Sequence, residues 1–189
     1  LGSKSVAIGK GTLNVQNFTT ATDGYNTAVG YHAGTSVSTG RFNSIVGGLA
    51  GDAFTTGEHN VAVGYQALTS AQESNRTVAV GSNALNEQNV AGTTYNVAVG
   101  YAAGVSITTG IQNTIIGGLA GDALTTSSSN VAVGYNALGA DDVGADSTAV
   151  GESALGSQNL ATGASTYNVA VGYQAGYYNV TGTGNTHIG

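Results

Sequence analysis

The sequence predicts an all-β protein: a parallel β-roll or β-solenoid of about eleven rungs of 17 residues. The first observation is a motif, NVAVGYAAG at 96–104, that recurs along the whole chain. The second is the spacing of its copies, which is 17 residues in most steps and 19 or 21 in the others. The third is a composition with 31 glycines and no proline, which suits a continuous backbone ladder with tight corners. So short a period is typical of solenoids, whose rungs are stable only when stacked.

The glycine of the motif marks each rung. The first and last markers are Gly9 and Gly189, and the others are Gly30, Gly47, Gly64, Gly81, Gly100, Gly117, Gly134, Gly151 and Gly172. Because every fourth step is long, a second period of four rungs lies over the first. We expect one repeat domain over 1–189, with units at 26–95, 96–167 and 168–189, the last truncated, and with 5–25 as the end of a preceding unit. The chain is expected to be a fragment of a longer fibre.

Apolar alternation predicts the two faces of each strand. The residue before the marker is always Val or Ile, and the residue three places before it is Val, Thr or Ser. These positions share a face, so we expect them to line the inside of the coil. The residue between them is Ala on eight rungs, and Ile45, Ile115 and His187 on the others. Since so thin a coil has little core, we expect this small-residue face to pack against neighbouring chains.

An asparagine stands four places before most markers. Asn tolerates left-handed corners and can bond its own backbone or the copy on the next rung, so a structural corner ladder is favoured over a binding role. Ser or Thr takes this place on the remaining three rungs. The ladder residues are Asn26, Asn43, Asn60, Asn96, Asn113, Asn130, Asn168 and Asn185.

The second half of each rung is less regular. Alanine three places after nearly every marker indicates a tight second corner or a packed interface. Apolar residues seven places after some markers are interpreted as capping the core from an outer strand; they are Val37, Phe54, Ile107 and Leu124. The long steps insert residues at 14–25, 86–95 and 156–167. Insertions of this kind map to loops on one side of a solenoid, where binding contacts are common.

Charge and composition exclude several function classes. The net charge is −6 with only four basic residues, so nucleic acid and anionic membranes are not expected partners. No apolar run approaches membrane-spanning length, so no membrane insertion is expected. No cysteine is present, which excludes disulfides and thiolate metal sites within the chain.

No catalytic, metal or cofactor site is predicted. His32, His59 and His187 stand at different rung positions, although three copies of His187 could hold an ion if they met on a threefold axis. A cluster at Asp141, Asp142 and Asp146 offers oxygen ligands for calcium, but no other unit repeats it. A solvated acidic loop is therefore favoured.

Tyrosines form two further rows. One row follows the marker on alternate rungs, at Tyr31, Tyr65, Tyr101, Tyr135 and Tyr173, and the other ends the three insertions, at Tyr25, Tyr95 and Tyr167. Rows of aromatic rings can stack on sugars, anchor a protein partner or cover gaps between chains. Packing between chains is favoured for the first row. Tyr25, Tyr95 and Tyr167 are the candidate ligand contacts.

The motif also carries a resemblance. The SVAIG sequence at 5–9 and the NVAVG copies resemble the repeats of trimeric autotransporter adhesin heads, and NVAVGYQAG at 168–176 is similar to repeat regions of phage tail fibres. The resemblance implies a left-handed parallel β-roll, three chains around a common axis, and an extracellular location on a virion tail fibre or a bacterial surface. The chain departs from the adhesin pattern in its 17-residue rungs and in the Tyr after the glycine.

The leading function is therefore a homotrimeric fibre segment that acts as a stiff, non-enzymatic spacer and contacts host glycans or surface proteins. A monomeric ice- or surface-binding solenoid is the alternative, because Thr55-Thr56, Thr108-Thr109 and Thr125-Thr126 suggest a Thr row. A glycan-cleaving enzyme is a third class, but such enzymes need paired carboxylates, and here the acidic residues are scattered.

Overall fold

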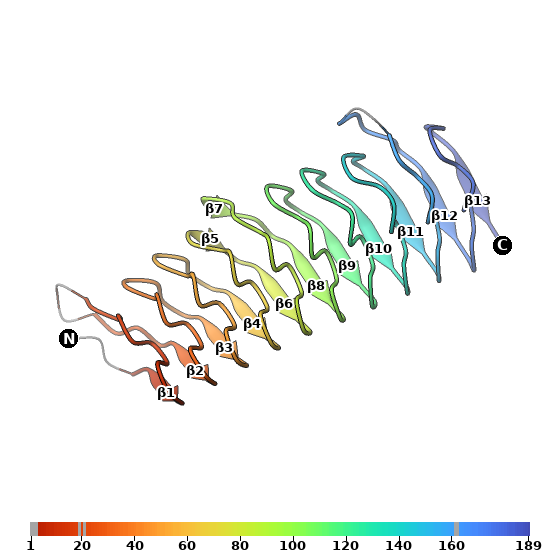
Figure 1. The fold of residues 1–189 in the computed structure, drawn as a ribbon. Coiled ribbons are helices and arrows are strands. Elements are labelled where there is room, and N and C mark those ends of the chain that lie inside the picture. The colour runs from red at the N-terminus through yellow and green to blue at the C-terminus, as the bar shows by residue number, and fades with distance from the viewer. Residues whose placement is uncertain (1–3, 19, 21, 161–162) are drawn as a thin grey trace.

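The chain folds into a parallel β-solenoid of eleven turns, which confirms the predicted fold class. The computed structural model describes residues 4–18, 20, 22–160 and 163–189. Figure 1 shows a long rod in which each turn adds one rung and β1 and β13 lie at opposite ends. The strands of the main sheet are β1 (Val6–Ile8), β2 (Thr27–Val29), β3 (Ser44–Val46), β4 (Val61–Val63), β6 (Val78–Val80), β8 (Val97–Val99), β9 (Thr114–Ile116), β10 (Val131–Val133), β11 (Thr148–Val150), β12 (Val169–Val171) and β13 (Thr186–Ile188).

The main sheet keeps one register throughout. Each strand pairs in parallel with the corresponding strand of the next rung, so that Val97 lies opposite Thr114 and Val99 lies opposite Ile116. Eleven strands at about 4.8 Å each give a rod on the order of 50 Å long. A second sheet has two strands. It pairs β5 (Ser74–Asn75) with β7 (Gly92–Thr93), and β7 lies within the insertion at 86–95. Among the described residues no helix is long and apolar enough to cross a membrane.

The two faces of the main sheet point in the opposite directions from those predicted. The residue two places before the marker points inward, and Ala62, Ala98 and Ile115 are fully buried. The flanking Val and Ile residues point outward; Val99 keeps 37% and Ile116 keeps 39% of its surface exposed. Alternation alone could not decide this, because both faces are apolar. The coil is thin, and a single methyl group suits the space inside it.

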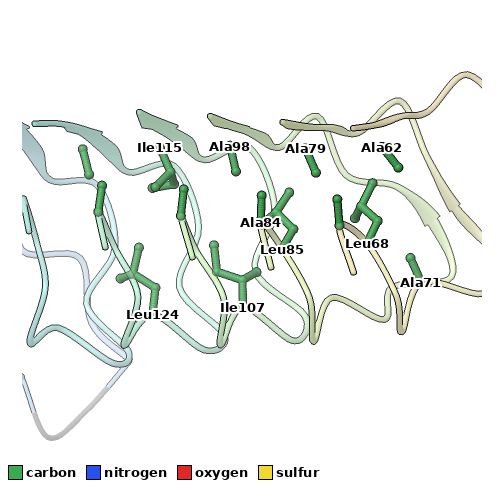
Figure 2. Packing of buried hydrophobic residues seen from close by; sticks show 14 of the residues in the cluster. Ala62, Leu68, Ala71, Ala79, Ala84, Leu85, Ala98, Ile107, Ile115 and Leu124 are labelled. Atoms are coloured by element: carbon green, nitrogen blue, oxygen red, sulfur yellow. The ribbon is translucent and has the colours of Figure 1, made fainter. Parts of the chain in front are cut away.

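From the rung of Gly9 to the rung of Gly151, the core is completed from the opposite wall by one large side chain per rung. On some rungs this side chain is Leu four places after the marker, as at Leu68, and on others it is the apolar residue seven places after, as at Ile107 and Leu124. Figure 2 shows these side chains facing Ala62 and its equivalents across the coil. The leucines of the first kind are Leu13, Leu68, Leu85, Leu138 and Leu155. The sequence analysis missed them, and they explain why the other apolar position is filled on only some rungs.

Each ladder asparagine joins its own rung to the next. Oδ1 of Asn43 accepts the N–H of Asn60 at 2.9 Å, and Nδ2 of Asn43 donates to the carbonyl of Gly57 at 2.8 Å. Asn26, Asn96, Asn113, Asn130 and Asn168 repeat this pattern. The expectation of left-handed asparagines is wrong: the left-handed residue is the one before each ladder position, as at Tyr95 with φ 53°.

A glutamine accompanies the rungs that lack the ladder asparagine. Thr77 stands in the Asn position, and Nε2 of Gln88 donates to its Oγ1 at 3.2 Å. Oε1 of the same glutamine accepts from Nδ2 of Asn96 at 2.7 Å. The pairs Gln16 with Ser5 and Gln158 with Ser147 repeat the first contact. The glutamine therefore carries the polar ladder past each long insertion.

The corner after each strand depends on the marker glycine. Gly30 has φ 140°, and a Cβ on it would lie 2.5 Å from the carbonyl oxygen of Gly47 on the next rung. A side chain is therefore excluded by both backbone conformation and space. The N–H of Ala33 then turns back to the carbonyl of Gly30 at 3.4 Å, and Ala33 is fully buried. The regular alanine thus belongs to a tight second corner.

Candidate interaction surfaces

The outward face of the main sheet is the largest regular apolar surface of the coil. It consists of two columns, one formed by the residue before each marker and one by the residue three places before it. The first column is all Val or Ile, and the second is Val with Thr or Ser on some rungs, as at Thr27, Ser44 and Thr114. No position of either column is charged. Below, the outer face means these two columns on the eleven strands of the main sheet.

The size of the outer face is informative. Three-residue strands are about 10 Å long, so eleven of them give a face on the order of 500 Å². Most positions on this face are apolar and the others are Thr or Ser, and contiguous apolar patches of a few hundred Å² commonly mark interaction sites. Parallel sheets, moreover, are usually covered on both sides. In the isolated chain only the alanine side of this sheet is covered.

The alternate-rung tyrosines are all exposed, by 54–65%. A Cβ on Gly48 would lie 3.6 Å from Cδ2 of Tyr65, and a Cβ on Gly118 would lie 3.7 Å from Cδ2 of Tyr135. Each of these two rings therefore lies against a glycine of the preceding rung, at the corner next to the outer face. Successive tyrosines of this row are two rungs apart, which is about 10 Å. More than half of each tyrosine's surface therefore remains exposed in the isolated chain.

Tyr25, Tyr95 and Tyr167 lie at the left-handed corner before the asparagine ladder, with φ between 49° and 53°. They are exposed by 46%, 58% and 65%. Four rungs separate each from the next, or about 19 Å, so the structure does not bring them into one pocket. They form a widely spaced row along one corner of the rod.

Tyr25 also begins a stack of rings along the same corner. Its ring lies parallel to that of Phe42 at 5.5 Å, and Phe42 lies parallel to His59 at 4.8 Å. Nζ of Lys4 lies 5.3 Å from the Tyr25 ring and 2.7 Å from Oδ2 of Asp23. Sequence analysis missed this stack, although Tyr25, Phe42 and His59 are spaced by one rung of 17 residues, which is the signal that could have found it.

The acidic cluster does not form a common site. Asp141 is fully buried, where its Oδ1 accepts the N–H of Gly144 at 2.9 Å and its Oδ2 accepts from Nε2 of Gln158. Burial raises the pKa of Asp141 above its usual range. Asp142 and Asp146 are only partly buried. In the described part of the chain no group of three or more His, Cys, Asp and Glu side chains is placed to hold a metal ion.

His187 points into its own coil. It pairs in register with Ala170, and a Cβ on Gly176 would lie 2.7 Å from its Cδ2. Its Nε2 is buried without a hydrogen-bond partner among the described residues. The hypothesis that three copies of His187 meet on an axis is therefore wrong. His32 bonds Thr35 locally, at 3.2 Å.

The threonine pairs do not present a full hydroxyl row. Thr55 Oγ1 donates to the carbonyl of Gln72 at 3.1 Å, and Thr125 Oγ1 donates to the carbonyl of Asp142 at 2.9 Å. Thr108 makes the same contact with the carbonyl of Thr125. These hydroxyl protons serve the ladder between rungs. The second threonine of each pair, such as Thr56, is exposed.

No protein-family model, no curated protein and no solved structure matches the chain.

Proposed function

We propose that this chain is a rigid segment of an extracellular fibre, of the kind found in phage tail fibres and bacterial surface adhesins. In this proposal three copies associate side by side through the outer face and carry load rather than catalyse a reaction. The number three, the location and the absence of catalysis rest on the resemblance of the NVAVG repeats.

The observation that carries the proposal is the outer face itself. Eleven strands present Val or Ile in one column and Val, Thr or Ser in the other, with no charge in either. Burying Val and Ile side chains that are about one-third exposed would add about 25 cal/mol for each Å² of apolar area removed from water. In a single chain this apolar area stays exposed to water. A second copy in the same orientation would cover it with a matching surface.

Stiffness follows from the continuous ladder. Every rung is bonded to the next through β-strands and corner amides, and most rungs are also joined through a buried asparagine. Each repeat contacts only its neighbours, so the number of rungs sets the length of the rod. This arrangement suits a spacer.

The insertions and their terminal tyrosines supply the proposed contacts with a host surface. Tyr25, Tyr95 and Tyr167 recur once per unit on one corner, where a glycan or protein could meet several of them at once. Repeated weak contacts on a stiff rod would add up through avidity.

The proposal is tested by substituting two residues of the outer face with lysine. Val99→Lys and Ile116→Lys together place cations on neighbouring strands at positions that a single chain leaves exposed, so one chain should still fold. Sedimentation equilibrium should give three times the 18.5 kDa chain mass for the unaltered protein and a monomer for the variant. Thr56→Lys with Thr126→Lys adds the same charge elsewhere and should remain trimeric. An unaltered protein that is monomeric at micromolar concentration would refute the proposal.

Ice binding remains the second candidate because the outer face is also a flat, regular array with hydroxyls at Thr27, Thr114 and Thr148. The threonine pairs that first suggested it are engaged between rungs, as at Thr55 and Thr108. Thermal hysteresis by the unaltered chain, lost in the double Lys variant while both proteins are monomeric, would favour this alternative.

A further inference from the structure

Two neighbouring rungs of the first unit carry side chains that the fold does not require. Arg41-Phe42 and Glu58-His59 precede the ladder asparagines of β3 and β4. The second unit repeats the same rungs 70 residues later with Ile111-Gln112 and Ser128-Ser129. The strands and the asparagine ladder around them are the same in both units. The second unit is thus an internal control, in which the same strands and asparagine bonds form without these four side chains.

The four side chains hold one another in place. Nε of Arg41 donates to Oε1 of Glu58 at 2.8 Å, and the rings of Phe42 and His59 lie parallel at 4.8 Å. The guanidinium carbon of Arg41 lies 5.4 Å from the centre of the Phe42 ring. The charged side chains are 38% and 30% exposed, so they remain accessible to a ligand. An arginine ordered by both a carboxylate and a ring is preorganised for binding.

A cavity of about 350 Å³ opens beside this pair. Its described lining consists of Phe18, Thr20, Thr22, Thr39, Arg41 and Glu58. That volume lies at the small end of the range for ligand pockets. The lining combines three hydroxyl groups, one ion pair and one aromatic ring. It contains donors, acceptors and an apolar surface within a small space.

We propose that this cavity binds a neutral hexopyranose, as a terminal residue of a glycan. The ion pair uses only Nε of Arg41 and Oε1 of Glu58 among the contacts of the described residues. This leaves the Nη groups of Arg41 as donors and Oε2 of Glu58 as an acceptor, a combination that suits sugar hydroxyls. Thr39 and the hydroxyl pair of Thr20 and Thr22, whose oxygens lie 3.0 Å apart, add further donors and acceptors, and the edge of the largely buried Phe18 supplies the apolar part of the lining. The Arg41–Glu58 pair has no net charge, which favours a neutral sugar over a charged one.

This inference rests on the proposed function, because it gives the fibre a specific glycan contact in its first unit. The experiment is saturation-transfer-difference NMR on the full chain with the methyl pyranosides of glucose, galactose and mannose as probes. At least one of the three should receive saturation, and titration should give a dissociation constant in the millimolar range. Arg41→Ile with Glu58→Ser installs the residues of the second unit and should fold normally. It should weaken binding at least about tenfold, as expected for the loss of a charged hydrogen-bonding pair.

Gln112→Ala with Ser129→Ala changes the matching corner of the second unit and should leave binding unchanged. Absence of saturation transfer to all three sugars at millimolar concentration would overturn the inference, and so would equal binding by the Arg41→Ile, Glu58→Ser variant. Light scattering on the same samples separates the two proposals. A monomer that binds sugar through this pair contradicts the fibre model alone, and a trimer that binds none contradicts the sugar site alone.

Discussion

A Cβ on Gly51 would lie 2.6 Å from Cε2 of Phe54, whose ring is fully buried on the same rung. Three rungs away the pattern is matched by Gly104 with Ile107, whereas on the rung after Phe54 a leucine, Leu68, stands four places after the marker and Ala71 seven places after it. Each rung thus has space for one large side chain from this wall. The choice between the two positions alternates two rungs at a time, in step with the four-rung period.

Because the two positions share one space, a substitution at one of them should restore stability lost by a substitution at the other. Phe54→Ala should destabilise the protein by about 3–5 kcal/mol, because it leaves a cavity. Gly51→Leu alone should cost about 1–3 kcal/mol, because the new side chain meets the Phe54 ring. The double variant reproduces the arrangement of Leu68 and Ala71, and Leu68 already adopts φ 53°, close to the 50° of Gly51. It should recover most of the lost stability.

Urea unfolding of the four proteins, at one fixed protein concentration, measures the coupling between the two sites. Additive losses in the double variant would contradict the shared-space model of the core.

Replacing one ladder asparagine by alanine should destabilise the protein strongly. Asn113→Ala would leave the N–H of Asn130 and the carbonyl of Ser127 buried without partners, since Asn113 binds them at 3.0 and 2.9 Å. Each unsatisfied group costs about 1–3 kcal/mol, so the variant should lose about 2–6 kcal/mol. Hydrogen exchange should also increase most at the rungs on either side.

Thr126→Ala, at an exposed position on the same rung, is the control and should change stability by less than about 0.5 kcal/mol. A loss of similar size in Asn113→Ala would mean that the ladder is dispensable.

Asp141 predicts a pH dependence specific to the second unit. Burial raises the pKa of its carboxyl group, partly offset by donors from Gln158 and Gly144. The folded state then holds the proton more tightly than the unfolded state. The stabilisation from this group is complete below the unfolded pKa of about 3.9 and is lost as pH rises through the folded pKa.

The first unit has Ala71 at this place. Asp141→Ala should therefore gain stability relative to the unaltered protein as pH rises above about 4, by up to about 1.4 kcal/mol per unit of pKa difference. Urea midpoints between pH 3 and 8 measure the difference, with exposed Glu87→Ala as a control for net charge. Parallel pH profiles for the Asp141→Ala and unaltered proteins would show that the carboxyl group titrates as it does in the unfolded chain.

Much of the fold could be predicted from the sequence because a 17-residue period leaves few alternatives to stacked rungs. The direction of each face could not, because Ala98 and Val99 are both apolar and alternation fixes only which residues share a side. Leu68 was overlooked as a core residue because leucine is not a usual residue for a left-handed corner. The cavity beside Arg41 could not be predicted either, since Phe18, Thr20 and Thr22 of its lining belong to an insertion whose conformation the 17-residue period does not fix.

The central claim is that copies of this chain associate in parallel and in register through the outer face. The chain contains no cysteine, so Val99→Cys carries a single spin label at a known place on that face. Facing sheets pack about 10 Å apart, so double electron–electron resonance should give interspin distances of about 15–25 Å once the label arms are included. The absence of dipolar coupling between spin labels at micromolar protein concentration would contradict this claim. An interspin distance comparable with the roughly 50 Å length of the rod would also contradict it.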